Sequence, residues 1–342
     1  MTQPIRDCVE PETSSARSRL GFLGVGWIGR NRMKAILDAG VAEIAAIVDS
    51  SAQMLSEARD WAPEAQVAAT LDDLIAMDLD GIVIATPSAL HAEQSIRALK
   101  ESIAVFCQKP LGRTQTEVRS VVDAARRADQ LLGVDLSYRF TEGMRRIHDL
   151  VRSGELGRIY AIDLVFHNAY GPDKAWFYDP ALAGGGCVMD LGVHLVDLAL
   201  WNLDYPVVSN VSSRLFAGGE PLLDPAAKVE DYAAATLELE TGAIVQLACS
   251  WKLQAGCDAM ISATFYGTQG GASLRNLNGS FYDFVAEHYR GTTRETLTMP
   301  PDEWGGRAAV DWARRLAAGE RFDPAAERFI DVAHVLDRIY GR

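Results

Sequence analysis

The chain has 342 residues, of which 48% are hydrophobic and 23% charged, and its formal net charge at pH 7 is −13. A chain of this length and composition is expected to fold as two domains of ordinary size, each with its own core. The negative charge argues against binding to nucleic acids or anionic membrane surfaces, because both repel an acidic protein.

The N-terminus lacks the apolar segment of a signal peptide, and residues 1–18 are expected to form a disordered tail. No apolar run reaches the roughly 20 residues of a membrane span. The five cysteines are odd in number and form no CxxC pair: Cys8, Cys107, Cys187, Cys249 and Cys257. This pattern favours free thiols in a reducing cytoplasm and gives no sign of a structural zinc site.

Residues 20–49 follow the order strand, glycine turn, helix, strand and acid. The apolar run 20–23 predicts a buried parallel strand, and it leads into Gly24-Val25-Gly26-Trp27-Ile28-Gly29. A helix with one apolar face is expected next, ending at Gly40. A second strand over 44–48 ends in Asp49. This order is typical of a dinucleotide-binding βαβ unit.

The residue types in this unit suit a dinucleotide. Gly24 permits the tight turn, Gly26 lets the backbone approach a pyrophosphate, and Gly29 lets helix and strand pack closely. Trp27 and Ile28 begin the helix, whose first N–H groups have no partner within it and can face phosphates. An ordinary βα turn is the alternative, and sites for FAD or S-adenosylmethionine share parts of the pattern.

Asp49 lies about 20 residues past the glycines, where a carboxylate can bind the hydroxyls of the adenosine ribose. A 2′-phosphate at this place would meet a negative charge. NAD is therefore expected rather than NADP, although Ser50 and Ser51 could still bind a phosphate.

Strands and helices keep alternating up to residue 138. Strands are expected near 67–69 and over 81–85, 103–107 and 131–136, and helices over 52–60, from 71, and over 89–99 and 114–128. This alternation predicts a parallel sheet covered by helices on both faces, with ligands beyond the carboxyl ends of its strands. Residues 19–138 are therefore expected to form a Rossmann dinucleotide-binding domain.

After Arg139 most strands are joined by turns rather than helices. A connecting helix is expected over 144–153, then strands over 159–167, 207–215, 232–240, 243–253, 260–267 and, more weakly, 281–285. Residues 139–342 should therefore form a second α/β domain with a large, mostly antiparallel sheet, for substrate binding and oligomerisation. Helices are expected over 188–203, 304–318 and 324–340, and the terminal pair could pack back on the first domain.

Two polar motifs could carry chemistry. Lys109 ends a strand on the ligand side and could donate a hydrogen bond to a substrate oxygen, although a solvated surface lysine is the alternative. Gly184-Gly185-Gly186 leads into an apolar helix that carries Asp190, His194 and Asp197 on one predicted stripe. His194 could act as a general base beside Asp190, or be a hydrogen-bonded core histidine. No metal site is expected from one histidine and two carboxylates without a second group of ligands.

These motifs resemble those of the glucose–fructose oxidoreductase, inositol dehydrogenase and rhizopine-catabolism (Gfo/Idh/MocA) family. The matching stretches are GFLGVGWIG at 21–29, TPSALHA at 86–92, QKP at 108–110 and GGGCVMDLGVHLVDLALW at 184–201. The resemblance covers nearly the whole chain. It implies a Rossmann domain followed by an α/β domain whose open sheet often forms the oligomer interface, here of a homodimer or homotetramer.

The resemblance also implies roles for single residues. Lys109 would contact substrate and nicotinamide, and Asp190 and His194 would complete the active site, with His194 as proton acceptor. Residues expected to lie beside the cofactor are Thr86, Pro87, His91 and Gln108, and those near the substrate are Tyr138 and Arg139. Gln108 replaces the glutamate that is usual in the family, so the charge beside Lys109 is lost, although an amide can still form hydrogen bonds.

The function expected is NAD(P)-dependent hydride transfer to or from a sugar, inositol or related polyol. His194 would take the hydroxyl proton, and Lys109 would bind the same oxygen. Aromatic residues before the triple glycine, including Trp176, could stack on the sugar or simply pack in the core. A non-catalytic dinucleotide sensor and an NAD-dependent glycosidase are the alternatives.

Overall fold

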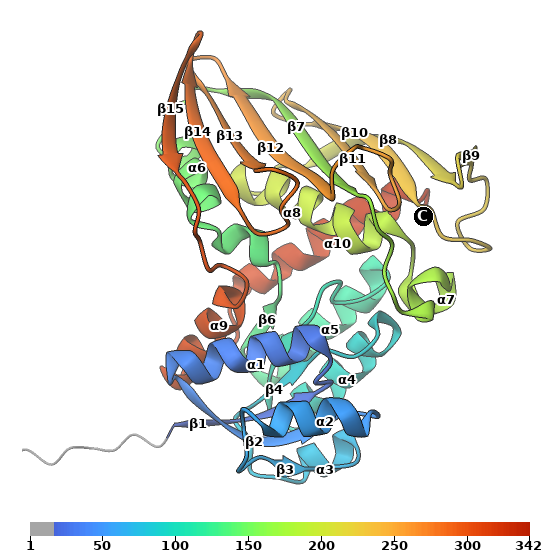
Figure 1. The fold of residues 1–342 in the computed structure, drawn as a ribbon, viewed down its shortest axis with the longest axis vertical. Coiled ribbons are helices and arrows are strands. Elements are labelled where there is room, and N and C mark those ends of the chain that lie inside the picture. The colour runs from blue at the N-terminus through green and yellow to red at the C-terminus, as the bar shows by residue number, and fades with distance from the viewer. Residues whose placement is uncertain (1–16) are drawn as a thin grey trace, which may run out of the picture.

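The computed structural model describes residues 17–342, which contain two sheets of different architecture (Figure 1). The predicted tail lies outside the described residues, except for Arg17 and Ser18. Ser18 is the first residue of strand β1 (Ser18–Leu23), so the first strand begins two residues earlier than the predicted run 20–23 and includes the last residue of the predicted tail.

The first sheet has six strands, all parallel, in the order β3-β2-β1-β4-β5-β6. The strands after β1 are β2 (Ala42–Val48), β3 (Gln66–Val67), β4 (Gly81–Ile84), β5 (Ala104–Cys107) and β6 (Leu132–Val134). The helices between them are α1 (Trp27–Ala39), α2 (Ala52–Arg59), α3 (Leu71–Ile75), α4 (Ser88–Lys100) and α5 (Gln115–Ala128). The strand order reverses at β1, so the carboxyl ends of β1 and β4 flank the ligand crevice of a Rossmann fold, as predicted.

The second sheet has nine strands in the order β15-β14-β13-β12-β7-β11-β10-β8-β9. Their bounds are β7 (Ile159–Asn168), β8 (Val208–Ala217), β9 (Glu220–Pro221), β10 (Tyr232–Leu239), β11 (Ile244–Ser250), β12 (Ala259–Gly267), β13 (Gly271–Asn276), β14 (Phe284–Arg290) and β15 (Thr293–Thr298). Only the β7–β11 pair is parallel, which confirms the mostly antiparallel sheet.

The sequence analysis missed β13, β15 and the two-residue β9, and it placed the strand that became β14 too early. β15 is a polar edge strand with mostly exposed side chains, so it lacks the alternation of apolar and polar residues that marks a half-buried strand. β13 begins with four buried residues, too short a run to be recognised by period.

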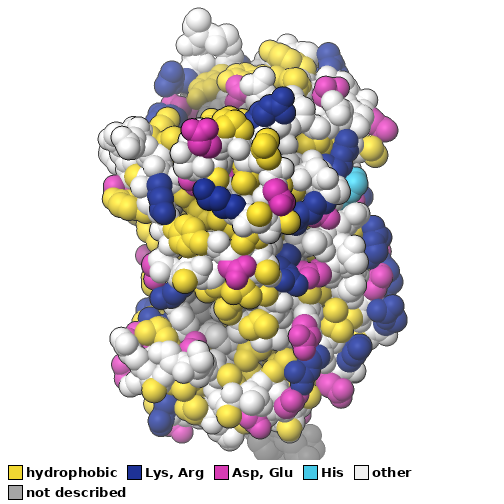
Figure 2. All heavy atoms as spheres, turned by 90° about the vertical axis from the view of Figure 1, so that its right-hand side faces the viewer, with side chains coloured by type: hydrophobic (Ala, Val, Ile, Leu, Met, Phe, Trp, Pro, Cys, Tyr) yellow, Lys and Arg dark blue, Asp and Glu magenta, His cyan; other side chains and the backbone are white. Residues whose placement is uncertain are grey.

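Three helices cover one face of the second sheet and lie between it and the first sheet (Figure 1). They are α6 (Glu142–Arg152), α8 (Val193–Asn202) and α10 (Arg328–Ile339), and the short α7 (Pro180–Ala183) lies at the side. Helix α9 (Arg307–Ala317) packs instead on α1 and the first sheet. On the side of the molecule that Figure 2 shows, acidic and basic side chains are interspersed and form no large patch of one sign.

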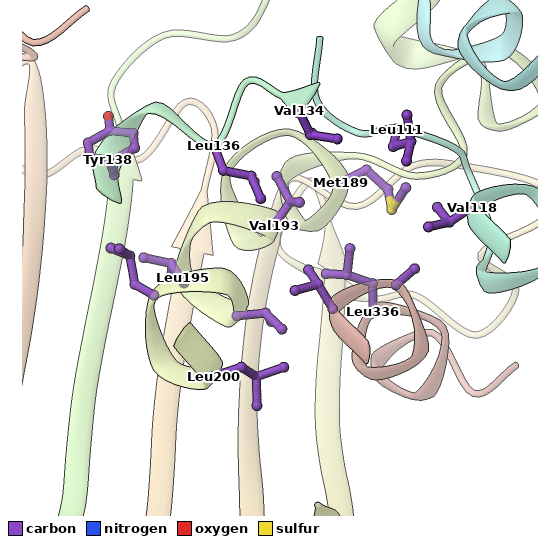
Figure 3. Close-up of a cluster of buried hydrophobic side chains, with 14 of the residues drawn as sticks. Leu111, Val118, Val134, Leu136, Tyr138, Met189, Val193, Leu195, Leu200 and Leu336 are labelled. Carbon is purple, nitrogen blue, oxygen red and sulfur yellow. The ribbon is translucent and has the colours of Figure 1, made fainter. Parts of the chain in front are cut away.

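A continuous hydrophobic core joins the two halves of the molecule. Leu111, Val134 and Leu136 from the first half face Met189 and Val193 across it (Figure 3). Leu336 of α10 closes the same cluster from one side. The carboxyl ends of β5 and β6 are thereby held against the start of α8, which sets the relative position of the functional motifs.

The helical segment after the triple glycine differs from the predicted single helix. Val188–Gly192 forms a π-helical turn, and α8 follows directly from it. The stretch Pro180–Asn202 is long and apolar enough to span a membrane by length and composition, which the sequence analysis did not recognise, but 83% of its most apolar window is buried inside the protein. Such burial is that of a core helix.

Candidate active site

A cavity of about 570 Å³ lies between the carboxyl ends of the first sheet and the α7–α8 side of the second half. It gathers most of the side chains that the sequence analysis selected. These are Gly26, Trp27, Ile28, Thr86, Pro87, His91, Gln108, Lys109, Tyr138, Trp176, Asp190 and His194. Residues separated by more than 100 positions in the chain therefore share one site.

The glycine turn at the entrance of α1 is shaped for close approach. Gly24 has φ +93°, and a Cβ on it would lie 2.5 Å from the backbone oxygen of Ala85. A Cβ on Gly29 would lie 2.2 Å from the oxygen of Gly24. By contrast, a Cβ on Gly26 would meet open space, and no side chain caps the helix that starts there. The N–H groups at this helix end are therefore free to bind a pyrophosphate.

Asp49 connects the end of β2 to the glycine turn. Its Oδ2 accepts a hydrogen bond from the N–H of Val25 at 2.8 Å, and its Oδ1 accepts one from the N–H of Ser51 at 2.9 Å. A carboxylate has about four acceptor positions, so two remain for ribose hydroxyls. The geometry fits the predicted ribose contact.

His91 holds two strand ends together. Its Nδ1 lies 2.7 Å from the backbone oxygen of Pro110, and its Nε2 lies 2.7 Å from the backbone oxygen of Thr86. Burial lowers the pKa of His91, while its two backbone hydrogen bonds oppose that shift. Because both nitrogens face backbone oxygens, His91 holds the segments after β4 and β5 together and presents no free nitrogen to a ligand.

Lys109 and Asp190 form an ion pair in the lining of the cavity. The Nζ of Lys109 donates to Asp190 Oδ1 at 2.6 Å and to the backbone oxygen of Asp190 at 2.7 Å. The indole N–H of Trp251 donates to the other carboxylate oxygen, Oδ2, at 3.0 Å. Asp190 therefore orients Lys109, and no hydrogen bond joins it to His194 in the described residues.

His194 is buried, and its ring lies edge-on to Tyr138 with 4.9 Å between centroids. Nδ1 is fully buried without a hydrogen-bond partner in the described part of the chain, which leaves Nε2 as the nitrogen accessible from the cavity. Burial, together with the positive charges of Lys109 and Arg32, holds the pKa of His194 well below its usual value of 6.5. The imidazole is therefore neutral at physiological pH and able to accept a proton.

The predicted stripe of Asp190, His194 and Asp197 is wrong for its last member. The π-helical turn changes the helical register of both His194 and Asp197 relative to Asp190. Asp197 is buried and accepts a hydrogen bond from Nε of Arg139 at 2.7 Å, and Arg139 also donates to the hydroxyl of Tyr205 at 2.6 Å.

Arg139 is a second correction, because it was expected near the substrate and does not line the cavity. The buried carboxylate of Asp197 takes its guanidinium group, which also forms an ion pair through Nη2. Burying the Asp197 carboxylate without a partner would cost free energy of folding. The arginine therefore points to this carboxylate and not into the cavity.

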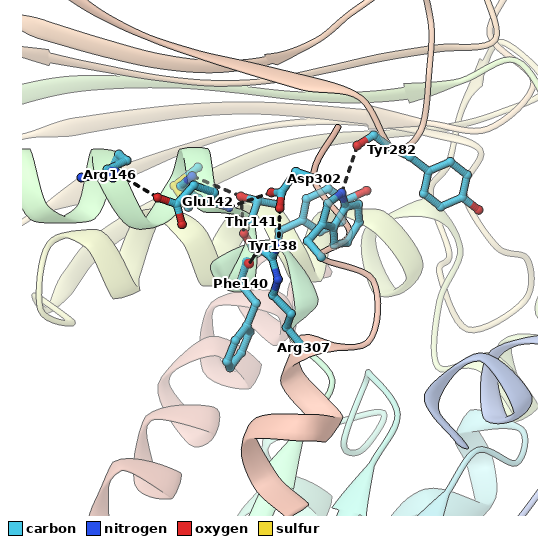
Figure 4. A network of polar contacts seen from close by, with 10 residues as sticks. Tyr138, Phe140, Thr141, Glu142, Arg146, Tyr282, Asp302 and Arg307 are labelled. Atoms are coloured by element: carbon cyan, nitrogen blue, oxygen red, sulfur yellow. Dashed lines mark hydrogen bonds and ion pairs between the residues drawn. The ribbon is translucent and has the colours of Figure 1, made fainter. Parts of the chain in front are cut away.

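Tyr138 is held in the cavity by the segment that links the two halves (Figure 4). Arg307 of α9 donates to the backbone oxygen of Phe140 at 3.0 Å and pairs with Asp302. Asp302 in turn accepts a hydrogen bond from the N–H of Glu142 at 2.8 Å, at the start of α6. These contacts fix the chain directly after Tyr138 and hence the wall behind His194.

Trp176 and Phe177 form an aromatic wall, with stacked rings whose centroids are 3.8 Å apart. Tyr170 and Tyr178 do not line the cavity. Within residues 17–342 no group of three or more His, Cys, Asp or Glu side chains could hold a metal ion.

The sequence analysis missed three polar residues of this cavity region: Arg32, Asp135 and Trp251. A signal was present for two of them. Arg32 lies between the buried positions Gly29 and Ile36 of α1, and Asp135 interrupts the apolar run 131–136. A charged residue at a position that the helical or strand period assigns to the core is often paired or functional.

Comparisons with known proteins agree with this architecture. The NAD-binding Rossmann model of the Gfo/Idh/MocA oxidoreductase family matches residues 18–136, and a C-terminal domain model of the same family matches residues 144–273. D-glucoside 3-dehydrogenase of Escherichia coli (strain K12) is 29% identical over 294 residues, which are 82% of this chain and 79% of that protein. Inositol 2-dehydrogenase 3 of Saccharopolyspora erythraea is 26% identical over 327 residues, 92% of this chain and 85% of that protein.

Solved structures show the same fold. Levoglucosan dehydrogenase in complex with NADH has a TM-score of 0.81 at 20% identity, covering 95% of this chain and 96% of that one. A 3-ketoreductase from Actinomadura kijaniata in complex with NADP has a TM-score of 0.79 at 20% identity, covering 95% of this chain and 97% of that one. With both family models matched in order along the chain, the protein belongs to the Gfo/Idh/MocA family and is an NAD(P)-binding oxidoreductase.

Proposed function

We propose that this protein is a dehydrogenase or reductase that interconverts a hydroxyl and a carbonyl group of a sugar, inositol or related polyol. The observation that carries the proposal is the convergence of Lys109, His194 and the open turn at Gly26 on one cavity. The names of relatives, a glucoside dehydrogenase and an inositol dehydrogenase among them, support the class of substrate.

The side chains of the cavity suit this chemistry. The ammonium group of Lys109 would bind the reacting oxygen and stabilise negative charge on it, while Asp190 and Trp251 hold the lysine in place. The accessible nitrogen of neutral His194 would take the hydroxyl proton in oxidation and return it in reduction. Trp176 and Phe177 would stack on the apolar face of the sugar ring. The nicotinamide, when bound, accepts or supplies the hydride.

The test is to supply NAD⁺ and then NADP⁺ with a panel of aldoses, inositols and polyols while following the absorbance of the reduced nicotinamide. Oxidation of one substrate class is the expected result. Cofactor binding without turnover across the panel, in both directions, would favour a sensor. Release of a glycosidic leaving group without net reduced cofactor would instead identify a glycosidase.

We infer that NAD is preferred over NADP, because Asp49 places a carboxylate where the adenosine ribose is expected. Asp49→Ala should weaken NADH binding about tenfold, the scale of a lost charged hydrogen bond, and weaken NADPH binding less. Titration of nicotinamide fluorescence with both cofactors measures the two dissociation constants. Asp38→Ala, which changes an exposed aspartate on α1, is the control. An unchanged ratio of the two constants in Asp49→Ala would refute the ribose contact.

We also propose that the uncovered face of the second sheet joins two copies of the chain. Apolar side chains are exposed on its central strands, including Ile244, Met260 and Tyr266. Exposed apolar side chains on a sheet face commonly mark an interface, and such a face can pack on its own copy about a two-fold axis. Light scattering should give the mass of a dimer or tetramer, and Met260→Asp should lower it. Leu223→Asp, in an exposed loop, should not. A monomeric wild-type protein would refute the proposal.

A further inference from the structure

Three polar side chains meet at one wall of the cavity, and the mechanism above uses none of them. Arg32 comes from α1, Gln108 follows β5 and Asp135 follows β6, and all three line the cavity. They are nearly buried, with 7%, 6% and 1% of their surface exposed, respectively. Asp135 Oδ2 accepts hydrogen bonds from Nε of Arg32 and Nε2 of Gln108, each at 2.6 Å.

This double contact fixes the orientation of both neighbours. Because Nε2 of Gln108 faces the carboxylate, its Oε1 points to another side and remains an acceptor. Because Nε of Arg32 faces the same carboxylate, its two Nη groups remain donors. No side chain or backbone group of residues 17–342 forms a hydrogen bond with these three atoms, and none of the three is fully buried. Since Arg32 and Gln108 are otherwise enclosed, the accessible atoms face the cavity.

A donor beside an acceptor is the complement of a primary carboxamide, which needs a donor for its carbonyl oxygen and an acceptor for its NH₂ group. The nicotinamide ring carries such a group, and Ile28, Lys109 and His194 line the same cavity. We infer that Arg32 and Gln108 bind the carboxamide of the nicotinamide, and that Asp135 is the positioning residue that orients both. The inference rests on the proposed function only in placing the nicotinamide in this cavity.

The same arrangement accounts for the glutamine at position 108. A glutamate there would place two carboxylates in direct contact, with Arg32 as the cation bonded to Asp135, and one of the two acids would have to be neutralised. With Gln108, the amide donates to Asp135 and one carboxylate balances one guanidinium. Gln108 and Asp135 therefore form one amide–carboxylate pair. The single acidic residue of this pair is at position 135, whereas the glutamate usual in the family would be at position 108.

Binding measurements without substrate test this directly. The ligands are NADH and ADP-ribose, which shares the adenosine, pyrophosphate and second ribose but lacks the nicotinamide. Gln108→Glu and Asp135→Asn should each weaken NADH binding about tenfold and change ADP-ribose binding less than about twofold. The double variant Gln108→Glu/Asp135→Asn restores one carboxylate facing one amide, so its NADH affinity should return to within about threefold of wild type.

A third variant covers the case in which these charge changes impair folding. Gln108→Met removes the acceptor without adding charge. Wild type should bind NADH more tightly than the reduced 3-acetylpyridine analogue, in which a methyl group replaces the NH₂, whereas Gln108→Met should bind the two equally. Gln130→Glu, at a buried glutamine outside the cavity, is the matched control for a new buried charge.

Three results would overturn the inference. The first is an equal loss of NADH and ADP-ribose affinity in the single variants. The second is a double variant whose loss of NADH binding free energy equals the sum of the losses in the two single variants. The third is a preference for NADH over the acetylpyridine analogue that survives in Gln108→Met. None of these depends on finding the substrate. A silent substrate panel would count against the proposed function while these binding data decide the carboxamide contact.

Discussion

Replacing His194 with alanine is expected to lower turnover by about 100-fold or more, the usual effect of losing a general base. The ring lies in the cavity with one accessible nitrogen, and Tyr138 packs against it. The glycine turn and Asp49, which would bind the rest of the cofactor, do not contact it. Cofactor affinity should therefore change less than about twofold.

The pH dependence of the oxidation rate is an independent test of His194 as the general base. The active form is the neutral imidazole, and burial with the charges of Lys109 and Arg32 lowers the pKa of His194. Protonation therefore occurs only at more acidic pH than for an ordinary histidine. The rate should hold as pH falls through 6.5 and decline only below it.

The measurements are steady-state kinetics from acidic to neutral pH and cofactor titration. The control is His334→Ala, which removes an exposed histidine on α10. Near-normal turnover in His194→Ala would exclude the proposed role. An acidic limb that has its midpoint above 6.5 would instead assign the base to another group.

Replacing Lys109 with methionine should reduce turnover by about 100- to 1,000-fold, the range seen when a group that stabilises a developing oxyanion is removed. Within the described residues, the ammonium group of Lys109 is the cation that pairs with Asp190. Lys109 lines the same cavity as His194. Methionine keeps much of the length of the side chain but cannot donate a hydrogen bond.

The change also leaves Asp190 without its cation, so two effects must be separated. The double variant Lys109→Met/Asp190→Asn removes the unpaired carboxylate. If loss of the lysine charge is what matters, the double variant should remain as slow as Lys109→Met. Recovery to near wild-type turnover would mean that Lys109 merely neutralises Asp190. Lys100→Met, at an exposed position on α4, is the control for loss of a lysine.

Much of the fold followed from local patterns. The glycine turn, the buried parallel strands and the helices of the first sheet appear where they were predicted, because a tight turn, a short apolar run and a helical period are properties of neighbouring residues. Strands with weak local signals were lost, namely the polar edge strand β15 and the short β13. Their pairing partners stabilise them, and these partners are not visible in the segment itself.

The candidate site divides in the same way. Sequence motifs were sufficient to select Lys109, Asp190 and His194, which do share one cavity. They did not reveal that Asp190 binds Lys109 across 81 residues, or that Gln108 faces Asp135. The family resemblance placed Arg139 near the substrate, whereas its guanidinium group binds Asp197, 58 residues away.

The sequence by itself thus determined the two-part architecture, the dinucleotide-binding turn and the residue types available for hydride-transfer chemistry. Tertiary structure alone decided which charged and polar groups are partners, as in the pairing of Arg32 with Asp135 across 103 residues. The physical reason is that a buried charge must be compensated by whichever group the packed elements bring within hydrogen-bond distance. That choice depends on how helices and strands pack, which is not visible in any one segment.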